Sequence, residues 1–304
     1  MKRPGILLLV ATPVLALAVM LAFNPRDPAP ATETGKHASV SHESRKGAKA
    51  RAERSEEEAE DDEVVADAPP GLAAAAKKDL AQQLVASAVH STLDWRSSYG
   101  SIEDFGDGQG YTAGIIGFCS GTQDLLTLVE HYTRDHPDNA LAPYLPALRE
   151  VDGTDSHEGL DPGFTAAWKA ESELPAFREA QEAERDRAYF NPAVRLAKLD
   201  GLGTLGQFVY YDAMVFHGPG TDPDSFYGLR ERVLQEADTP AMGGSEKAYL
   251  DIFLDMHRKV MKDRKPDVGT ERIDAAQRQF LNDGNMDLKT PLVWTLHGKT
   301  YRVP

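Results

Sequence analysis

The residues best suited by type to do chemistry in this sequence are carboxylates grouped around a glycine-rich turn. They are Asp94, Glu103, Asp104 and Asp107, and the turn is Gly106-Asp107-Gly108-Gln109-Gly110. Glycines permit a tight turn and a close approach of the backbone to a ligand. Glycoside hydrolysis needs two carboxyl groups across the scissile bond, one donating a proton and one activating water or attacking carbon. Since isolated acidic residues are usually solvated surface groups, this pattern alone is only a weak indication of glycan chemistry.

Other kinds of site have less support. The nine histidines include no His-x-x-x-His pair, and no His-x-Glu is followed by Cys-x-x-Cys. The sequence also lacks a Gly-x-Ser-x-Gly elbow and a phosphate-binding loop. Cys119 is the single cysteine, and its apolar neighbours predict a buried small side chain rather than a nucleophile. We therefore predict no metal and no cofactor.

The elements that must position these carboxylates are mostly helical. Apolar periodicity predicts helices at 80–88, 125–132, 165–190, 193–199 and 249–261, and a largely apolar segment covers 201–214. Only Tyr111 to Thr122, directly after the glycine-rich turn, has strand character. Loops are expected at 155–159 and 217–220. The fold class expected is mainly α with one small β-sheet.

The first 70 residues differ in composition from the rest of the chain. Lys2 and Arg3 precede an apolar run, so residues 1–23 are expected to be a signal peptide or an uncleaved signal anchor. Residues 24–70 are rich in proline and charge and are expected to form a disordered linker. The basic block of this linker could alternatively bind acidic wall polymer or lipid head groups. Residues 71–304 are long enough for one folded domain.

This organisation predicts a secreted protein, or one anchored to the membrane and facing outside if the apolar run is not cleaved. The net charge of −15 argues against binding to nucleic acid and favours tolerance of cationic partners. We expect a monomer whose possible membrane tether is the apolar segment at 6–23 alone.

Several motifs at collinear spacing resemble the chitosanases of glycoside hydrolase family 46, over roughly residues 72–300. They include Leu93-Asp94-Trp95, Ile102-Glu103-Asp104, the turn itself with Tyr111-Thr112, and Gly114-Ile115-Ile116-Gly117-Phe118-Cys119-Ser120-Gly121-Thr122. Further ones are Tyr144-Leu145-Pro146-Ala147-Leu148, Gly153-Thr154-Asp155-Ser156-His157-Glu158-Gly159-Leu160, Glu184-Arg185-Asp186-Arg187, Asp200-Gly201-Leu202-Gly203, Tyr210-Tyr211-Asp212-Ala213 and His217-Gly218-Pro219-Gly220.

The resemblance implies a lysozyme-like fold of two helical lobes, with a small antiparallel sheet beside an acidic cleft. It implies an inverting endo-hydrolase of β-1,4-linked glucosamine polymer, so the expected partner is chitosan or a related polycation. On this basis Asp107 is the general base and Thr112 helps to hold the attacking water. The residues that fall on or near substrate-contact positions are Glu103, Gln109, Thr122, Asp124, Tyr189 and His217.

The sequence departs from the family at the position of the catalytic acid. The family carries a glutamate five residues before the aspartate of Leu93-Asp94-Trp95, and this chain has Val89 there, which cannot donate a proton. Gln109 stands where the family has an arginine. A supporting network of one aspartate and two arginines retains Asp212 and Arg272 but has His257 at its third position.

Two interpretations therefore remain open at the level of sequence. In the first, the chain is a hydrolase whose acid is unidentified, with His90, Glu103 or another carboxylate replacing the missing one. In the second, it is a catalytically silent exported protein that binds amino-sugar polymer. Val89 by itself could also be a packing residue that continues the apolar stripe of Val85 and Ala88.

Overall fold

The computed structural model describes residues 54–56 and 58–304. The predicted signal segment 1–23 and most of the predicted linker 24–70 lie outside the described residues. Within the described part of that linker, residues 58–67 are helical. Arg195 pairs with Asp62 at 2.7 Å and with Asp61 at 3.5 Å. These ion pairs hold the end of the predicted linker against the folded domain, so this stretch is not irregular coil.

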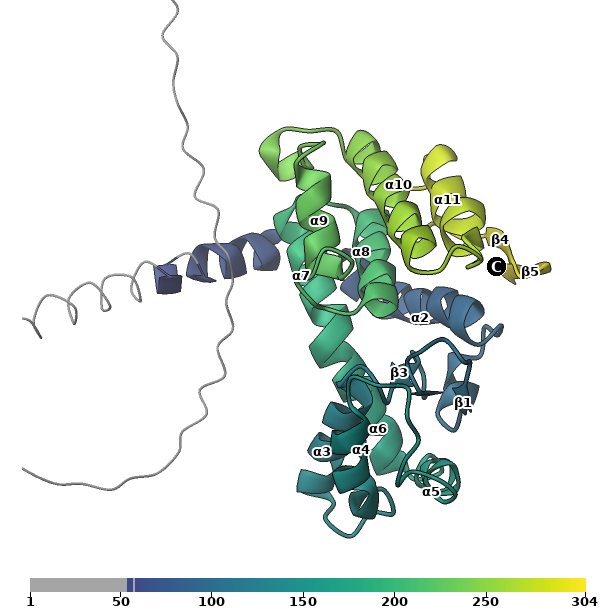
Figure 1. Ribbon diagram of the computed structural model, residues 1–304. Helices are drawn as coiled ribbons and strands as arrows, with labels where there is room; N and C mark the ends of the chain where they lie inside the picture. The colour runs from purple at the N-terminus through teal and green to yellow at the C-terminus, as the bar shows by residue number, and fades with distance from the viewer. Residues whose placement is uncertain (1–53, 57) are drawn as a thin grey trace, which may run out of the picture. The chain divides into compact units, whose positions relative to one another are not determined.

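One lobe of the domain combines short helices with a three-stranded sheet (Figure 1). Its helices are α3 (Asp124–Asp135), α4 (Leu145–Val151), α5 (Phe164–Glu171) and α6 (Pro175–Arg185). The sheet consists of β1 (Ile102–Asp104), β2 (Tyr111–Ala113) and β3 (Phe118–Cys119), all antiparallel. Glu103 lies opposite Thr112, and Thr112 lies opposite Cys119. The glycine-rich turn connects β1 to β2 and therefore emerges at one end of this sheet.

The second lobe is almost entirely helical. It contains α2 (Ala75–Val89), α7 (Asn191–Leu199), α8 (Thr204–His217), α9 (Phe226–Leu234), α10 (Glu246–Arg264) and α11 (Arg278–Asn282). Helix α8 is central, because nearly all of its side chains are buried. That burial explains why the segment 201–214 is apolar on all sides rather than along one stripe.

A continuous helical path joins the two lobes (Figure 1). Helix α6 runs into a π-helical turn, Asp186–Phe190, and then directly into α7. π-Helical turns inside helices are often found at functional sites. Tyr189, predicted to contact substrate, lies in this turn.

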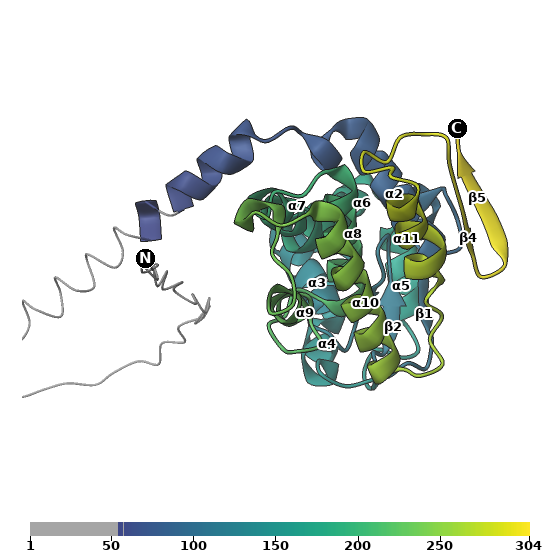
Figure 2. The same ribbon diagram turned by 90° about the horizontal axis from the view of Figure 1, so that it is seen from above.

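The structure differs from the sequence-based prediction in two places. The segment 165–190 is not one helix, because the chain turns at 172–174 and restarts at Pro175, whose ring favours the first turn of a helix. A second sheet, β4 (Leu292–Leu296) and β5 (Lys299–Val303), was not predicted. This hairpin lies at the edge of the domain beside α2 and α11 (Figure 2). The Trp294 indole donates a hydrogen bond to Ser87 of α2 at 3.0 Å.

The prediction of a mainly helical fold with a small antiparallel sheet is confirmed. Among the described residues, no helix is long and apolar enough to cross a membrane. These described residues also contain no cluster of three or more His, Cys, Asp or Glu side chains that could hold a metal ion.

Candidate active site

Two adjoining hollows lie between the sheet and the ends of α8 and α10, and we refer to them together as the cleft. The larger has a volume of about 440 Å³ and the smaller about 220 Å³. Both are lined by Gln109, Gly117, Cys119, Val215, Phe216 and Arg264. The larger hollow also contains Val89, Asp107 and Thr112. The smaller hollow also contains Thr122, Asp124, Tyr189 and His217. The fold thus gathers residues from far apart in the sequence along one continuous wall.

Asp107 projects from the glycine-rich turn into the larger hollow. Gly106 and Gly108, on either side of it, have φ angles of 64° and 85°, which other residues adopt only with strain. The Gln109 side-chain amide donates to Asp107 Oδ2 at 3.1 Å, and Lys265 Nζ lies 3.8 Å from the same oxygen. The Asp107 side chain keeps 19% of its surface exposed. The carboxylate is therefore oriented by a neutral donor and remains accessible to water.

Val89 is the last residue of α2 and faces the same hollow. A Cβ atom added to Gly117 would lie 3.4 Å from Val89 Cγ1 and 3.0 Å from Thr112 Cγ2. Val89 and Thr112 thus flank Gly117, next to the position where Thr112 is predicted to hold water. At the position where the resemblance predicts an acid, the cleft therefore has an apolar surface.

The two side chains predicted as substitute acids lie outside the hollows. His90 Nε2 is 2.9 Å from the carbonyl oxygen of Gly114, and burial lowers the pKa of the His90 imidazole. Glu103 faces the same side of the sheet as Thr112 but is exposed and lines neither hollow. Neither group is placed to protonate a leaving group in the larger hollow.

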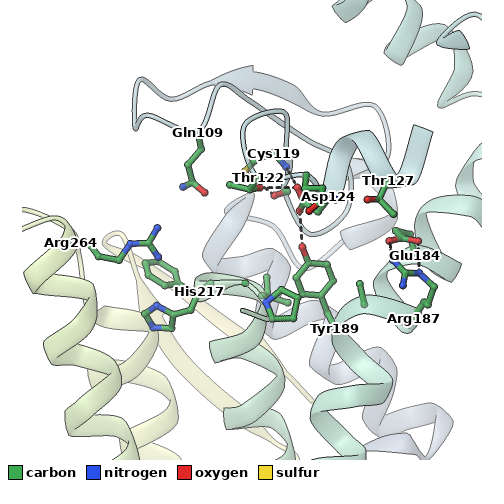
Figure 3. Close-up of a pocket in the computed structure, with 17 residues that line it drawn as sticks. Gln109, Cys119, Thr122, Asp124, Thr127, Glu184, Arg187, Tyr189, His217 and Arg264 are labelled. Carbon is green, nitrogen blue, oxygen red and sulfur yellow. Dashed lines mark hydrogen bonds and ion pairs between the residues drawn. The ribbon is translucent and has the colours of Figure 1, made fainter. Parts of the chain in front are cut away.

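Asp124, at the start of α3, is held by four hydrogen bonds. Its Oδ1 accepts from the backbone N–H groups of Cys119 and Leu125, both at 2.9 Å, and from the Thr122 hydroxyl at 2.8 Å. Its Oδ2 accepts from the Tyr189 hydroxyl at 2.7 Å (Figure 3). Because these bonds occupy the carboxylate, its main effect is to fix Tyr189 and Thr122 at the wall of the smaller hollow.

The titration of Asp124 gives a testable pH dependence. Burial raises the pKa of this carboxyl to about 6, despite hydrogen bonds that favour the charged form. The folded protein then binds more protons than the unfolded chain between the ordinary pKa of 3.8 and about 6. Stability therefore falls as pH rises through this window.

Asp124→Asn should reduce this pH-dependent loss of folding stability by on the order of 2 kcal/mol. The amide oxygen can accept the three Oδ1 bonds, and the amide nitrogen can donate to Tyr189. Urea unfolding of both proteins at pH 4 and pH 7 measures the difference. Equal pH slopes in the two proteins would show that Asp124 is already ionised throughout.

His217 and His257 form a buried pair, in which His217 lines the smaller hollow and His257 lies outside both hollows. Their ring centroids are 4.7 Å apart, and none of their ring nitrogens has a hydrogen-bond partner among the described residues. Burial, with the neighbouring His257, lowers the pKa of His217 to about 2. Burial, with Arg272, lowers the pKa of His257 to about 3. Both rings are neutral near neutral pH, so neither can supply the missing proton.

The predicted supporting network is present in part. Arg272 donates to Asp212 Oδ1 at 2.6 Å and to Oδ2 at 3.1 Å, and Gln277 donates to Oδ2 at 2.5 Å. His257 makes no hydrogen bond to this group within the described chain. The third member of this network is therefore Gln277, which was not among the predicted site residues.

The charge of the cleft differs from the acidic surface that the resemblance implies. Its charged lining consists of three carboxylates, Asp107, Asp124 and Glu184, and four cations, Arg187, Arg264, Lys265 and Arg272. Arg264 and Lys265 were not among the predicted site residues. Their only signal in the sequence is the end of a helix, where basic residues are common for electrostatic reasons.

The comparisons with known proteins agree with this geometry. The model of glycosyl hydrolase family 46 matches residues 83–292. The chain is 53% identical to a chitosanase of Streptomyces sp. (strain N174) over 225 residues, which are 74% of this chain and 81% of that protein. It is 36% identical to a chitosanase of Bacillus subtilis (strain 168) over 226 residues, or 71% and 80% of the two chains.

Solved structures of chitosanases are also similar to this protein. A chitosanase co-crystallised with substrate superposes with a TM-score of 0.76 at 48% identity, covering 78% of this chain and all of that one. A Gynuella sunshinyii chitosanase in complex with chitotetraose gives a TM-score of 0.70 at 32% identity, with coverages of 75% and 97%. The protein belongs to glycosyl hydrolase family 46, a family of glycosidases.

Proposed function

We propose that this protein hydrolyses β-1,4 linkages in glucosamine polymers of the chitosan type, with inversion at the anomeric carbon. The observation that carries the proposal is the position of Asp107 and Thr112 in one hollow of the cleft. Family membership supports the reaction type. The relatives named as chitosanases, and the neighbour in complex with chitotetraose, support the substrate class.

In the proposed reaction a water molecule held by Thr112 gives a proton to Asp107 while its oxygen attacks the anomeric carbon. The bond from that carbon to the leaving sugar oxygen breaks, and this oxygen must then gain a proton. An inverting hydrolase usually supplies it from a second carboxyl group, leaving room for water between the two. Here Val89 occupies the acid position, so the proton comes from solvent. Departure of the leaving group is then the slow step.

The other residues have supporting roles in this proposal. Gln109 orients Asp107 through its side-chain amide. Thr122, Tyr189 and His217 line the smaller hollow and offer a surface for neighbouring sugars. Asp124 acts on the substrate through Tyr189, since its own oxygens are occupied. Glu103 is available only to a sugar that extends beyond the hollows.

The test is release of reducing ends from soluble chitosan. The unmodified protein should release them slowly, and Asp107→Asn should lower that rate by about 10²-fold or more, because the water loses its base. Gln109→Ala is a suitable comparison, since it removes the orienting donor and leaves the carboxylate. Equal rates for the unmodified protein and Asp107→Asn would contradict the assignment of the base.

One observation favours a second candidate function. Since Val89 is apolar and neither His90 nor Glu103 lines the cleft, the domain could bind amino-sugar polymer without turning it over. This alternative predicts saturable, salt-sensitive binding of glucosamine oligomers in calorimetry, with no reducing ends formed. Product analysis of the same samples separates the two functions.

The site of action is also part of the proposal. The basic and apolar start of the sequence supports an exported protein that acts outside the cell, either released or held by the segment 6–23. A polymeric substrate fits such a location, because it cannot readily enter a cell. We propose that the domain acts there as a monomer.

A further inference from the structure

The cleft carries a different balance of charge from the rest of the protein. The whole chain has a net charge of −15, yet cationic side chains outnumber carboxylates in the cleft by four to three. A site that bound only a polycation would be expected to show the opposite balance, because like charges in a binding site repel the ligand. Because Arg272 is neutralised by Asp212 outside the lining, the cleft is close to neutral rather than acidic.

Most of these charges are already paired within the protein. Arg187 donates to Glu184 through Nε at 2.9 Å, and Arg272 pairs with Asp212. Lys265 lies near Asp107. In each of these pairs the cation and the carboxylate neutralise each other, so the pair attracts a charged ligand only weakly.

Arg264 is the exception. It lines both hollows, and its side chain has no hydrogen bond or ion pair with any other described residue. Its guanidinium points into the smaller hollow, on the side of Gln109 (Figure 3).

Stabilisation of the end of α10 does not explain why the Arg264 side chain extends into the cleft. Arg264 ends α10, and a cation there stabilises the negative end of the helix. However, Lys262 lies in the same last turn and contacts carbonyl groups at the helix end, namely those of Pro266 and Val268. Lys262 lines neither hollow, whereas Arg264 extends into both.

We propose that Arg264, assisted by Lys265, binds a carboxylate carried by the glycan, so that the ligand is an amino-sugar polymer bearing both amino and carboxylate groups. This inference rests on the proposed function, since it names the substrate class of the same cleft. A guanidinium offers parallel N–H donors that match the two oxygens of a carboxylate. The Asp107 side chain keeps 19% of its surface exposed in the larger hollow, so an ammonium or hydroxyl group of a neighbouring sugar can approach it.

The probes are three glucosamine hexamers of equal length. One has all its amines free, one has a single N-acetyl group, and one has a single N-succinyl group at the same position. The last two both lose one ammonium, and only the succinyl group adds a carboxylate. Titration calorimetry with the full chain at low salt should show the succinylated hexamer binding about five- to tenfold more tightly than the acetylated one.

The preference should disappear in Arg264→Glu/Lys265→Glu. It should persist in Lys259→Glu, which reverses one charge on α10 outside the cleft. Thermal melting of each variant confirms that the domain is folded before binding is compared.

The possible results distinguish failure of the carboxylate-binding inference from failure of the proposed function. If the free-amine hexamer binds and the succinylated one binds no more tightly than the acetylated one, the inference is wrong and the proposed function stands. A preference that survives in the double variant also overturns it, because the carboxylate is then bound elsewhere. If no hexamer binds, both the proposed function and the inference are contradicted.

Discussion

Val89→Glu is expected to raise the rate of chitosan hydrolysis by about 10²- to 10⁴-fold, the usual contribution of a positioned general acid. Val89 is the last residue of α2 and faces the hollow that contains Asp107 and Thr112. A carboxyl group there lies at the negative end of the helix and beside apolar side chains such as Ile116. Both features favour the protonated form that an acid catalyst needs. Initial rates of reducing-end release over a range of pH would measure the gain.

Val89→Gln is the matched control, since it has the same size and polarity but no acidic proton. It should give no comparable gain. The Glu variant should also acquire a loss of activity on the alkaline side that the unmodified protein lacks, because the new acid deprotonates there. Equal gains from Gln and Glu would show that position 89 affects packing or substrate binding rather than proton transfer.

Arg272→Met is expected to destabilise the folded domain by about 3–5 kcal/mol, the usual consequence of leaving a buried charge without its partner. The Asp212 side chain is 2% exposed and Arg272 is 12% exposed, and two hydrogen bonds join them. Arg272 also lies over the Phe216 ring at 5.0 Å, so its loss loosens the wall of the cleft. Urea unfolding at pH 7 would measure the change in free energy.

Arg278→Met provides a control on a neighbouring helix. Arg278 pairs with Asp251 and Asp255, and because Asp255 is 73% exposed we expect a loss of at most about 1 kcal/mol. Asp212→Asn/Arg272→Met should recover part of the lost stability, since no buried charge then remains. If Arg272→Met costs no more than Arg278→Met, the Asp212 network does not stabilise this side of the cleft.

The parts of the fold that could be predicted from sequence are those with a strong local pattern. Helices α2, α3 and α10 follow from apolar periodicity, and the turn around Asp107 follows from its glycines. The hairpin β4–β5 was missed although Leu292, Trp294 and Leu296 alternate with exposed residues. The alternation is short, and its apolar face is stable only because Trp294 packs against α2.

The site could be predicted only in outline. Motifs located Asp107, Thr112 and Val89, and the structure places all three in one hollow. Pairing between distant segments could not be predicted, because it depends on tertiary contacts. Gln277 reaches Asp212 across 65 positions of sequence, and Arg264 faces Gln109 from a helix that begins at Glu246. Val89 at the predicted acid position is visible in the sequence, but the gathering of Arg264 and Lys265 at the cleft is visible only in the fold.

The most direct measurement compares Val89→Glu with Val89→Glu/Asp107→Asn on the same soluble chitosan. If Asp107 is the base of a cleft that lacks only its acid, the gain from the introduced carboxyl group depends on Asp107. The double variant should then release reducing ends at least about 10²-fold more slowly than the single variant. A double variant that keeps the full gain would show that Asp107 does not activate the attacking water, and would contradict the mechanism proposed for this protein.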